Sequence, residues 1–112
     1  MRELLYSAAE HYKRGVALSD EGKVRQAVHA FGEAVSDLHA VRPQRMRDVL
    51  LAQVHLSRYQ TAKSHNPKAA LQDLRFGYSY ARTTREPAVQ ELAESLWHDY
   101  LQKQGGQGVE TL

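Results

Sequence analysis

Histidine is the residue whose chemistry first suggests a site, because six of the 112 residues are histidines. Imidazole nitrogens bind zinc and related metals, and helical metal sites place two ligands three or four residues apart or in an HExxH arrangement. Neither arrangement occurs among the six, which are His11, His29, His39, His55, His65 and His98. We therefore predict that the chain binds no metal, and we interpret His29, His39 and His98 as surface residues on polar helix faces.

Carboxylates and nucleophiles offer no better basis for catalysis. Asp20 and Glu21 are the only adjacent acids, and they coincide with a predicted break between helices. Glu91 and Glu94 share one helical face, where paired carboxylates are usually solvated rather than set in a cleft for acid–base work. The sequence has no cysteine, no glycine-rich phosphate loop and no GxSxG motif. We therefore predict that the protein is not an enzyme and uses no cofactor.

The elements that carry these side chains are all predicted to be helices. Apolar residues recur at helical spacing along the chain, and the strict alternation of a strand is absent. Pro43, Pro67 and Pro87 each stand where the first turn of a helix should lie, and Asn66 is suited to cap the helix that follows it. Together with the break at 20–22, they divide the chain into five helices at about 2–19, 23–40, 43–64, 67–83 and 87–103.

The arrangement of the helices follows from their short connections and their apolar faces. Links of roughly two to four residues make consecutive helices antiparallel neighbours. The third helix carries two apolar stripes and is therefore predicted to be central; they are Met46, Val49, Leu50 and Leu56, and Leu51, Val54, Tyr59 and Ala62. We expect one all-α domain over 1–103, with Gly105 and Gly106 ending the last helix and a flexible tail over 104–112.

The first hairpin resembles a tetratricopeptide (TPR) repeat, a helix–turn–helix unit of about 34 residues. The resemblance is carried by Tyr12, Gly15, Leu18, Gly22, Ala27, Phe31 and Ala34. Small residues let the two helices approach closely, and glycine permits the tight turn. Ala70, Leu71, Leu74 and Gly77 repeat part of the pattern 43 residues later, but Arg58 then falls at the position of Gly15. The resemblance covers about 8–40 closely and 44–81 weakly, and a plain helix bundle is the alternative.

The resemblance implies a protein-binding function and a set of contact residues. In TPR proteins the first helix of each repeat lines a groove that holds an extended or helical peptide, and the fifth helix here is similar to the polar capping helix of such arrays. Carried over by position, the groove residues are Tyr12, Val16, His55, Arg58, Tyr59 and Lys63. Such a groove suits an acidic or carboxylate-bearing partner. The TPR domains that bind chaperone tails use a Lys/Asn clamp, but Tyr12 and Val16 occupy two of those clamp positions here. The resemblance therefore favours an adaptor, scaffold or other chaperone-like role over the binding of chaperone tails.

The charge distribution leaves two other functions open. The net charge is only +2, but residues 42–85 contain nine Lys or Arg and two acids (+7), whereas residues 86–112 contain one Lys and five acids (−4). Aromatic residues interleave with the arginines of the fourth helix, as in proteins that contact nucleic-acid backbones and bases. Alternatively, the acidic fifth helix neutralises the basic fourth. A homodimer or larger homo-oligomer, with Phe76 and Tyr80 among its contacts, is a further alternative.

The remaining composition favours a soluble cytoplasmic protein. No apolar run approaches the ~20 residues that a membrane-spanning helix needs. The first residues lack the apolar stretch and cleavage site of a signal peptide. The absence of cysteine agrees with a reducing compartment. We therefore expect no membrane partner.

Overall fold

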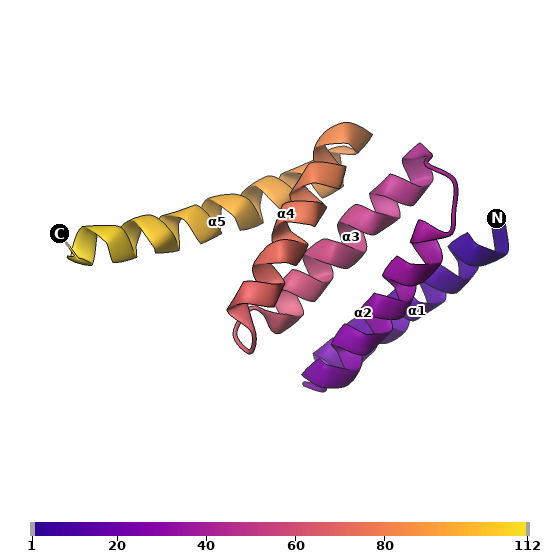
Figure 1. Ribbon diagram of the computed structural model, residues 1–112, viewed down its shortest axis with the longest axis horizontal. Coiled ribbons are helices and arrows are strands. Elements are labelled where there is room, and N and C mark those ends of the chain that lie inside the picture. Colours follow the sequence, from indigo (N-terminus) through magenta and orange to yellow (C-terminus); the bar gives the residue numbers. More distant parts are fainter. Residues whose placement is uncertain (1, 112) are drawn as a thin grey trace.

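The structure is a computed structural model that describes the backbone of residues 2–111 and the side chains of residues 2–104. Its elements are α1 (Arg2–Asp20), α2 (Val24–His39), α3 (Arg45–Ala62), α4 (Pro67–Thr84) and α5 (Pro87–Thr111). The described backbone contains no strand, which confirms the predicted all-α class. Figure 1 shows α1 and α2, and then α3 and α4, as antiparallel hairpins, with α5 packed against the second hairpin.

The helix starts follow the predicted proline and cap signals in two cases of three. Pro67 and Pro87 are the first residues of α4 and α5. The Asn66 side chain accepts a hydrogen bond of 3.4 Å from the backbone N–H of Ala69, so one N–H left unpaired at the start of α4 is satisfied. The third start was predicted too early. α3 begins at Arg45 because Gln44 is extended and serves as the N-cap, which leaves Pro43 in the preceding loop.

The predicted end of the last helix is wrong. The backbone of α5 stays helical to Thr111, past Gly105 and Gly106, and Leu112 lies outside the described residues. Glycine lowers helix stability by about 1 kcal/mol relative to alanine, but it does not forbid helical dihedral angles. The two glycines therefore predicted a helix end at a point where the backbone remains helical. Even with this length, no helix among the described residues combines the extent and apolarity needed to cross a membrane.

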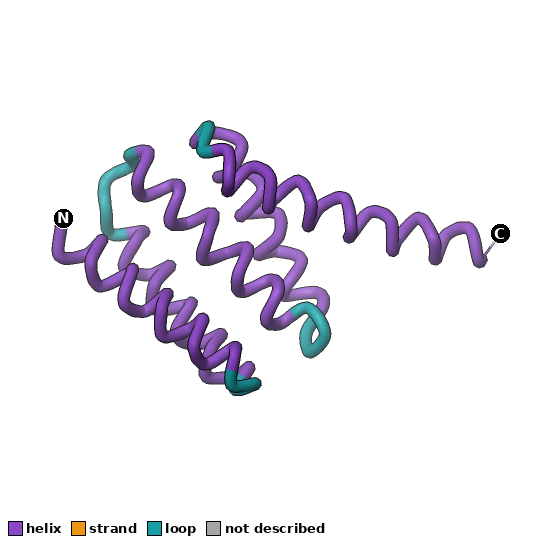
Figure 2. The backbone as a smooth tube through the Cα atoms, turned by 180° about the vertical axis from the view of Figure 1, so that it is seen from behind, coloured by secondary structure: helices purple, strands orange, loops and turns teal. Residues whose placement is uncertain are grey.

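The helices form two layers. α1 and α5 face the viewer in Figure 2, whereas α2 and α4 lie toward the viewer in Figure 1. α3 contacts all four other helices. In the described part of the chain no Cα atom of α2 lies within 8 Å of one in α4. Since α2 and α4 are both antiparallel to α3, they run in the same direction with α3 between them.

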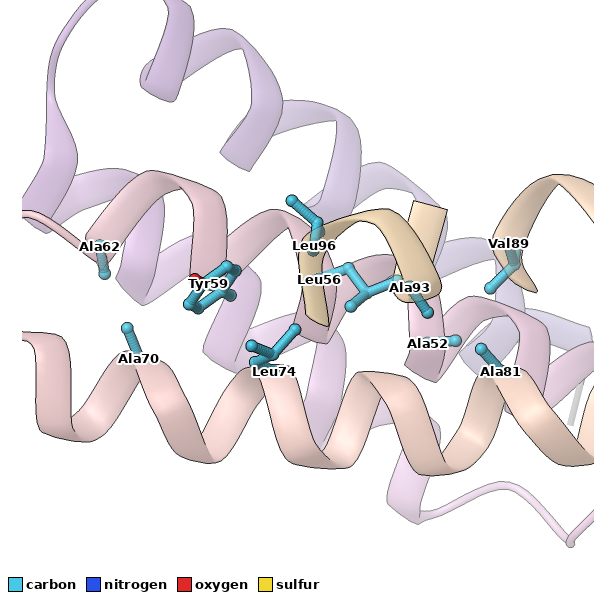
Figure 3. Close-up of a cluster of buried hydrophobic side chains, with 10 residues drawn as sticks. All are labelled: Ala52, Leu56, Tyr59, Ala62, Ala70, Leu74, Ala81, Val89, Ala93 and Leu96. Atoms are coloured by element: carbon cyan, nitrogen blue, oxygen red, sulfur yellow. The ribbon is translucent and has the colours of Figure 1, made fainter. Parts of the chain in front are cut away.

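Two hydrophobic clusters meet at α3, which confirms that this helix is central. Leu51 and Val54 pack into a cluster with α1 and α2, around Phe31 and Leu38. The other cluster joins α3 to α4 and α5 (Figure 3); its α3 members are Ala52, Leu56, Tyr59 and Ala62. The predicted stripes were partly misassigned, because Tyr59 and Ala62 lie with Leu56 rather than with Leu51. Met46 is 53% exposed and belongs to neither buried stripe.

In each hairpin a glycine allows the two helices to approach closely. The first helix carries this glycine in the first hairpin, and the second helix carries it in the second hairpin. A Cβ on Gly15 of α1 would lie 2.5 Å from the buried ring of Phe31 on α2. In the second hairpin the first helix supplies the large residue, because a Cβ on Gly77 of α4 would lie 2.6 Å from Leu56 Cδ2 on α3. This exchange explains how the second hairpin closes although Arg58 stands where the first has Gly15.

The close approach predicts opposite effects for two helical glycines. Gly77→Ala should destabilise the fold by about 1–3 kcal/mol, because overpacking against buried Leu56 outweighs the gain in helix propensity. Gly32→Ala should instead stabilise the fold by about 0.5–1 kcal/mol, since its Cβ would meet only Arg58 Nη1 at 3.6 Å. Urea unfolding of both variants measures the difference. Equal stability of Gly77→Ala and wild type would contradict the proposed contact.

Candidate partner-binding groove

The six residues predicted to line one groove lie on different sides of α3. Tyr12 and Val16 remain on the α1 side, where the Tyr12 hydroxyl lies 3.0 Å from Ser57 Oγ. Val16 lines a shallow cavity of about 180 Å³ between α1 and α3. This volume is below the roughly 300–1,000 Å³ of typical ligand pockets. The binding role of these two residues stays a prediction.

Tyr59 and Lys63 lie together, but against α5 rather than beside Tyr12. They line a second small cavity, of about 280 Å³, with Asp99 and Tyr100 among its other residues. The Lys63 Nζ atom is 5.6 Å from the centroid of the Tyr59 ring. Tyr59 is 8% exposed and is part of the α3–α4–α5 cluster. Burial raises the pKa of its phenol above 10.0, and Tyr100 and Asp99 raise it further.

His55 and Arg58 contact α4 instead and share its Asp73 carboxylate. Arg58 donates from Nε to both Asp73 oxygens at 2.9 Å, and its Nη2 is 2.7 Å from Oδ1. His55 Nδ1 also lies 2.9 Å from Oδ1. An ionised carboxylate only accepts, so His55 Nδ1–H is the donor. Asp73 is 6% exposed, and these three donors supply the partners that a buried charge requires.

Aromatic rings enclose the imidazole of this network. The His55 ring is 5.3 Å from that of Phe76 and stacks on Tyr80 at 6.0 Å with an interplanar angle of 12°. His55 itself is 4% exposed. A histidine oriented by an aspartate is a familiar catalytic pair, but a general base must reach its substrate within about 3 Å. The enclosure of this ring therefore favours a structural role, in which the network fixes the rotation of α4 against α3.

A larger groove lies between α2 and α4, on the face opposite the predicted one. We call it the α2/α4 groove, and its volume is about 650 Å³. Its apolar wall consists of Val24, Val28, Ala62, Ala69, Ala70 and Phe76. Phe76 is 52% exposed, so its ring adds accessible apolar surface to the groove. Arg58 and Asp73 also line the groove, so the buried network forms part of its wall.

Three cations without an ion pair among the described residues lie in or next to this groove. Arg25 lines the groove, while Lys68 and Arg75 lie on the exposed side of α4, four residues before and three after the groove residue Gln72. None of these three cations forms an ion pair or hydrogen bond among the described residues. No ion pair joins α4 to α5 among the described residues, although Arg82 and Glu94 line one small cavity between the two helices. Arg45 to Glu86, at 3.2 Å, is the one ion pair in the described chain between residues 42–85 and the acidic residues that follow.

Sequence reasoning missed the buried network and the α2/α4 groove. Asp73 is one of only two acids among residues 42–85, and its place on the α4 side turned toward α3 was a usable signal for an ion pair. The sequence indicated Phe76 only as a candidate contact of a homo-oligomer. Its position beside α2 depends on how the two hairpins pack against each other. Among the side chains described, no group of three or more His, Cys, Asp and Glu is arranged to hold a metal ion.

Comparisons with known proteins add no family assignment. The chain matches no protein-family model, and no curated protein or solved structure matches it significantly. The TPR resemblance therefore continues to rest on residues of the first hairpin, of which Gly15, Ala27 and Phe31 are buried at the contact between α1 and α2.

The shared carboxylate predicts a large loss of stability on neutralisation. Asp73→Asn should destabilise the fold by about 2–4 kcal/mol, because the partly buried Arg58 charge loses its partner. Glu21→Gln removes a carboxylate paired with Lys23 on the surface and should cost at most about 1 kcal/mol. Chemical denaturation compares the two variants. If Arg58→Met in the Asp73→Asn background restores no stability, the unpaired charge is not the cause.

The raised pKa of Tyr59 predicts a pH dependence above 10. The unfolded chain loses this phenolic proton at lower pH than the folded chain does, so the free energy of unfolding should fall as pH rises through the folded pKa. Tyr59→Phe should remove this part of the fall. Asp99→Asn should retain most of it, since burial is the larger cause. Urea titrations from pH 8 to about 11 measure it, and an identical fall in wild type and Tyr59→Phe would contradict the assignment.

Proposed function

We propose that the chain is a TPR-like protein-binding module that holds a segment of a partner protein in the α2/α4 groove. The observation that carries this proposal is an apolar groove of about 650 Å³ beside an exposed Phe76. Burial of apolar surface is the main favourable term in protein association, and aromatic side chains are enriched among the residues that contribute most. We also propose that the module is cytoplasmic. The absence of cysteine agrees with this, because disulfide bonds are typical of proteins in oxidising compartments.

The volume and residues of the cavities favour this face over the one first predicted. The two cavities on the α1–α3–α5 side measure about 180 and 280 Å³ and share no lining residue. Hydrogen bonds between Tyr12 and Ser57 and between Ser19 and Thr61, the latter at 2.9 Å, already occupy polar groups there. The α2/α4 groove is larger, and six of its twelve lining residues are apolar.

The α2/α4 groove is tested by filling it. Ala69→Trp adds bulk to the groove wall at an exposed position of α4, and Gln60→Trp adds the same bulk to the cavity between α1 and α3. A photo-crosslinking amino acid at Gln72 then reports contact in the native cell lysate. We expect one crosslinked protein with wild type and Gln60→Trp, and a loss of at least about tenfold with Ala69→Trp.

The same experiment separates the other two functions. A crosslink that disappears after nuclease treatment, or one formed only to another copy of the chain, would replace the proposal by nucleic-acid binding or by homo-oligomer formation. A crosslink lost with Gln60→Trp and kept with Ala69→Trp would move the partner to the α1–α3 side. Tyr59→Ala is unsuitable for this comparison, because Tyr59 is a core residue.

A further inference from the structure

We infer that the segment held in the α2/α4 groove is an acidic amphipathic helix of a separate protein. This inference rests on the proposed function, and it adds the chemistry of the partner. Its three supports are the cations around the groove, the lack of backbone partners inside it, and the poor fit of the chain's own acidic helix.

The charge around the groove selects an acidic partner. Arg25 lines the groove, Lys68 and Arg75 flank its residue Gln72 on α4, and none of the three has an ionic partner among residues 2–104. Arg58 contributes less, because Asp73 already neutralises its guanidinium. Charges at the rim of an interface steer association and discriminate between partners more than they add affinity. A segment with carboxylates on the sides of an apolar stripe would place them against these three cations.

The lining of the groove selects a helix over an extended chain. A helix satisfies its own backbone hydrogen bonds, whereas an extended segment needs donors and acceptors from its host. Most polar groups in this groove are already engaged. The Asn66 side chain caps α4, Asp73 binds Arg58 and His55, and His65 Nδ1 lies 3.2 Å from Ser64 Oγ. The groove also lies between two helices that run in the same direction over a third, so a fourth helix would extend the same packing.

The chain's own acidic helix does not fit this description. The apolar side of α5 is used within the fold, since Val89, Ala93 and Leu96 are buried against α3 and α4 (Figure 3). The exposed part carries Glu91, Glu94 and other polar residues, together with Leu92 and Leu101. These two leucines are nine residues apart and therefore lie on opposite sides of the helix, so a second copy would bring matching charge but no continuous apolar stripe. A different protein, with its acids beside an unburied apolar stripe, satisfies both requirements.

Three synthetic helices test the inference. All have leucines at the i, i+3, i+4 and i+7 positions, and the remaining positions are glutamate-rich, glutamine-rich or lysine-rich. Fluorescence anisotropy measures their binding to wild type, to Lys68→Glu/Arg75→Glu, and to Arg2→Glu/Lys13→Glu, which makes the same charge change on α1. We expect the acidic helix to bind wild type and the control about tenfold more tightly than the neutral helix. The groove double variant should reverse this order in favour of the lysine-rich helix, and added salt should reduce both preferences.

The outcomes separate this inference from the proposed function. Binding of the neutral and acidic helices with equal affinity, lost in both cases with Ala69→Trp, would overturn the acidic partner and keep the groove. No binding of the acidic helix up to roughly 1 mM would also overturn the inference, whatever the crosslink at Gln72 shows. Binding that survives Ala69→Trp would contradict the groove itself. An equal loss with the α1 control variant would show that net charge, not the groove rim, determines the preference.

Discussion

Helix α3 has to bury side chains on two sides at once, and the rest of the fold is arranged around that requirement. Leu51 and Val54 face α1 and α2, while Leu56 faces α4 and α5, so each hairpin depends on this one helix for its core. A helix with two apolar sides is unstable alone in water, because one side stays exposed whichever hairpin forms first. The two clusters are therefore expected to support each other, with Tyr80 packed against both.

The polar network of Asp73 lies at the seam between these clusters and limits how the second hairpin can pack. A buried ion pair adds little net stability, because the cost of removing both charges from water roughly offsets their attraction. It does penalise alternative rotations of α4, in which Asp73 would be buried without Arg58. On the α2 side the guanidinium lies next to Gly32, where a Cβ would be at an ordinary contact distance of 3.6 Å from Arg58 Nη1. The network thus fixes the face of α4 that carries Phe76 toward the groove.

The sequence predicted what depends on local patterns and failed where packing between hairpins decides. Pro67, Pro87 and Asn66 mark helix starts through their own backbone chemistry, so those boundaries were correct. The central position of α3 followed from its double stripe. The rotation of α3 about its axis could not be predicted from the stripes. Tyr59 and Ala62 lie near the border between them, so a small rotation of the helix places these residues in either cluster. The partners of His55 and Arg58 depend on that rotation and on Gly77 rather than on any local spacing.

The separation of charge follows from the same two-layer arrangement. Lys68 and Arg75 are exposed on α4, away from its buried contacts with α3. The acidic helix α5 packs on the face of the second hairpin opposite to α2 (Figures 1 and 2). The acids of α5 therefore lie beyond the reach of a direct ion pair with Lys68 or Arg75, although the two regions are adjacent in sequence. A net charge near zero conceals this arrangement, since it sums two oppositely charged faces. The cations near the groove stay open to a partner because the acids of α5 form no ion pair with them and the carboxylate that lines the groove, Asp73, is bound to Arg58 and His55.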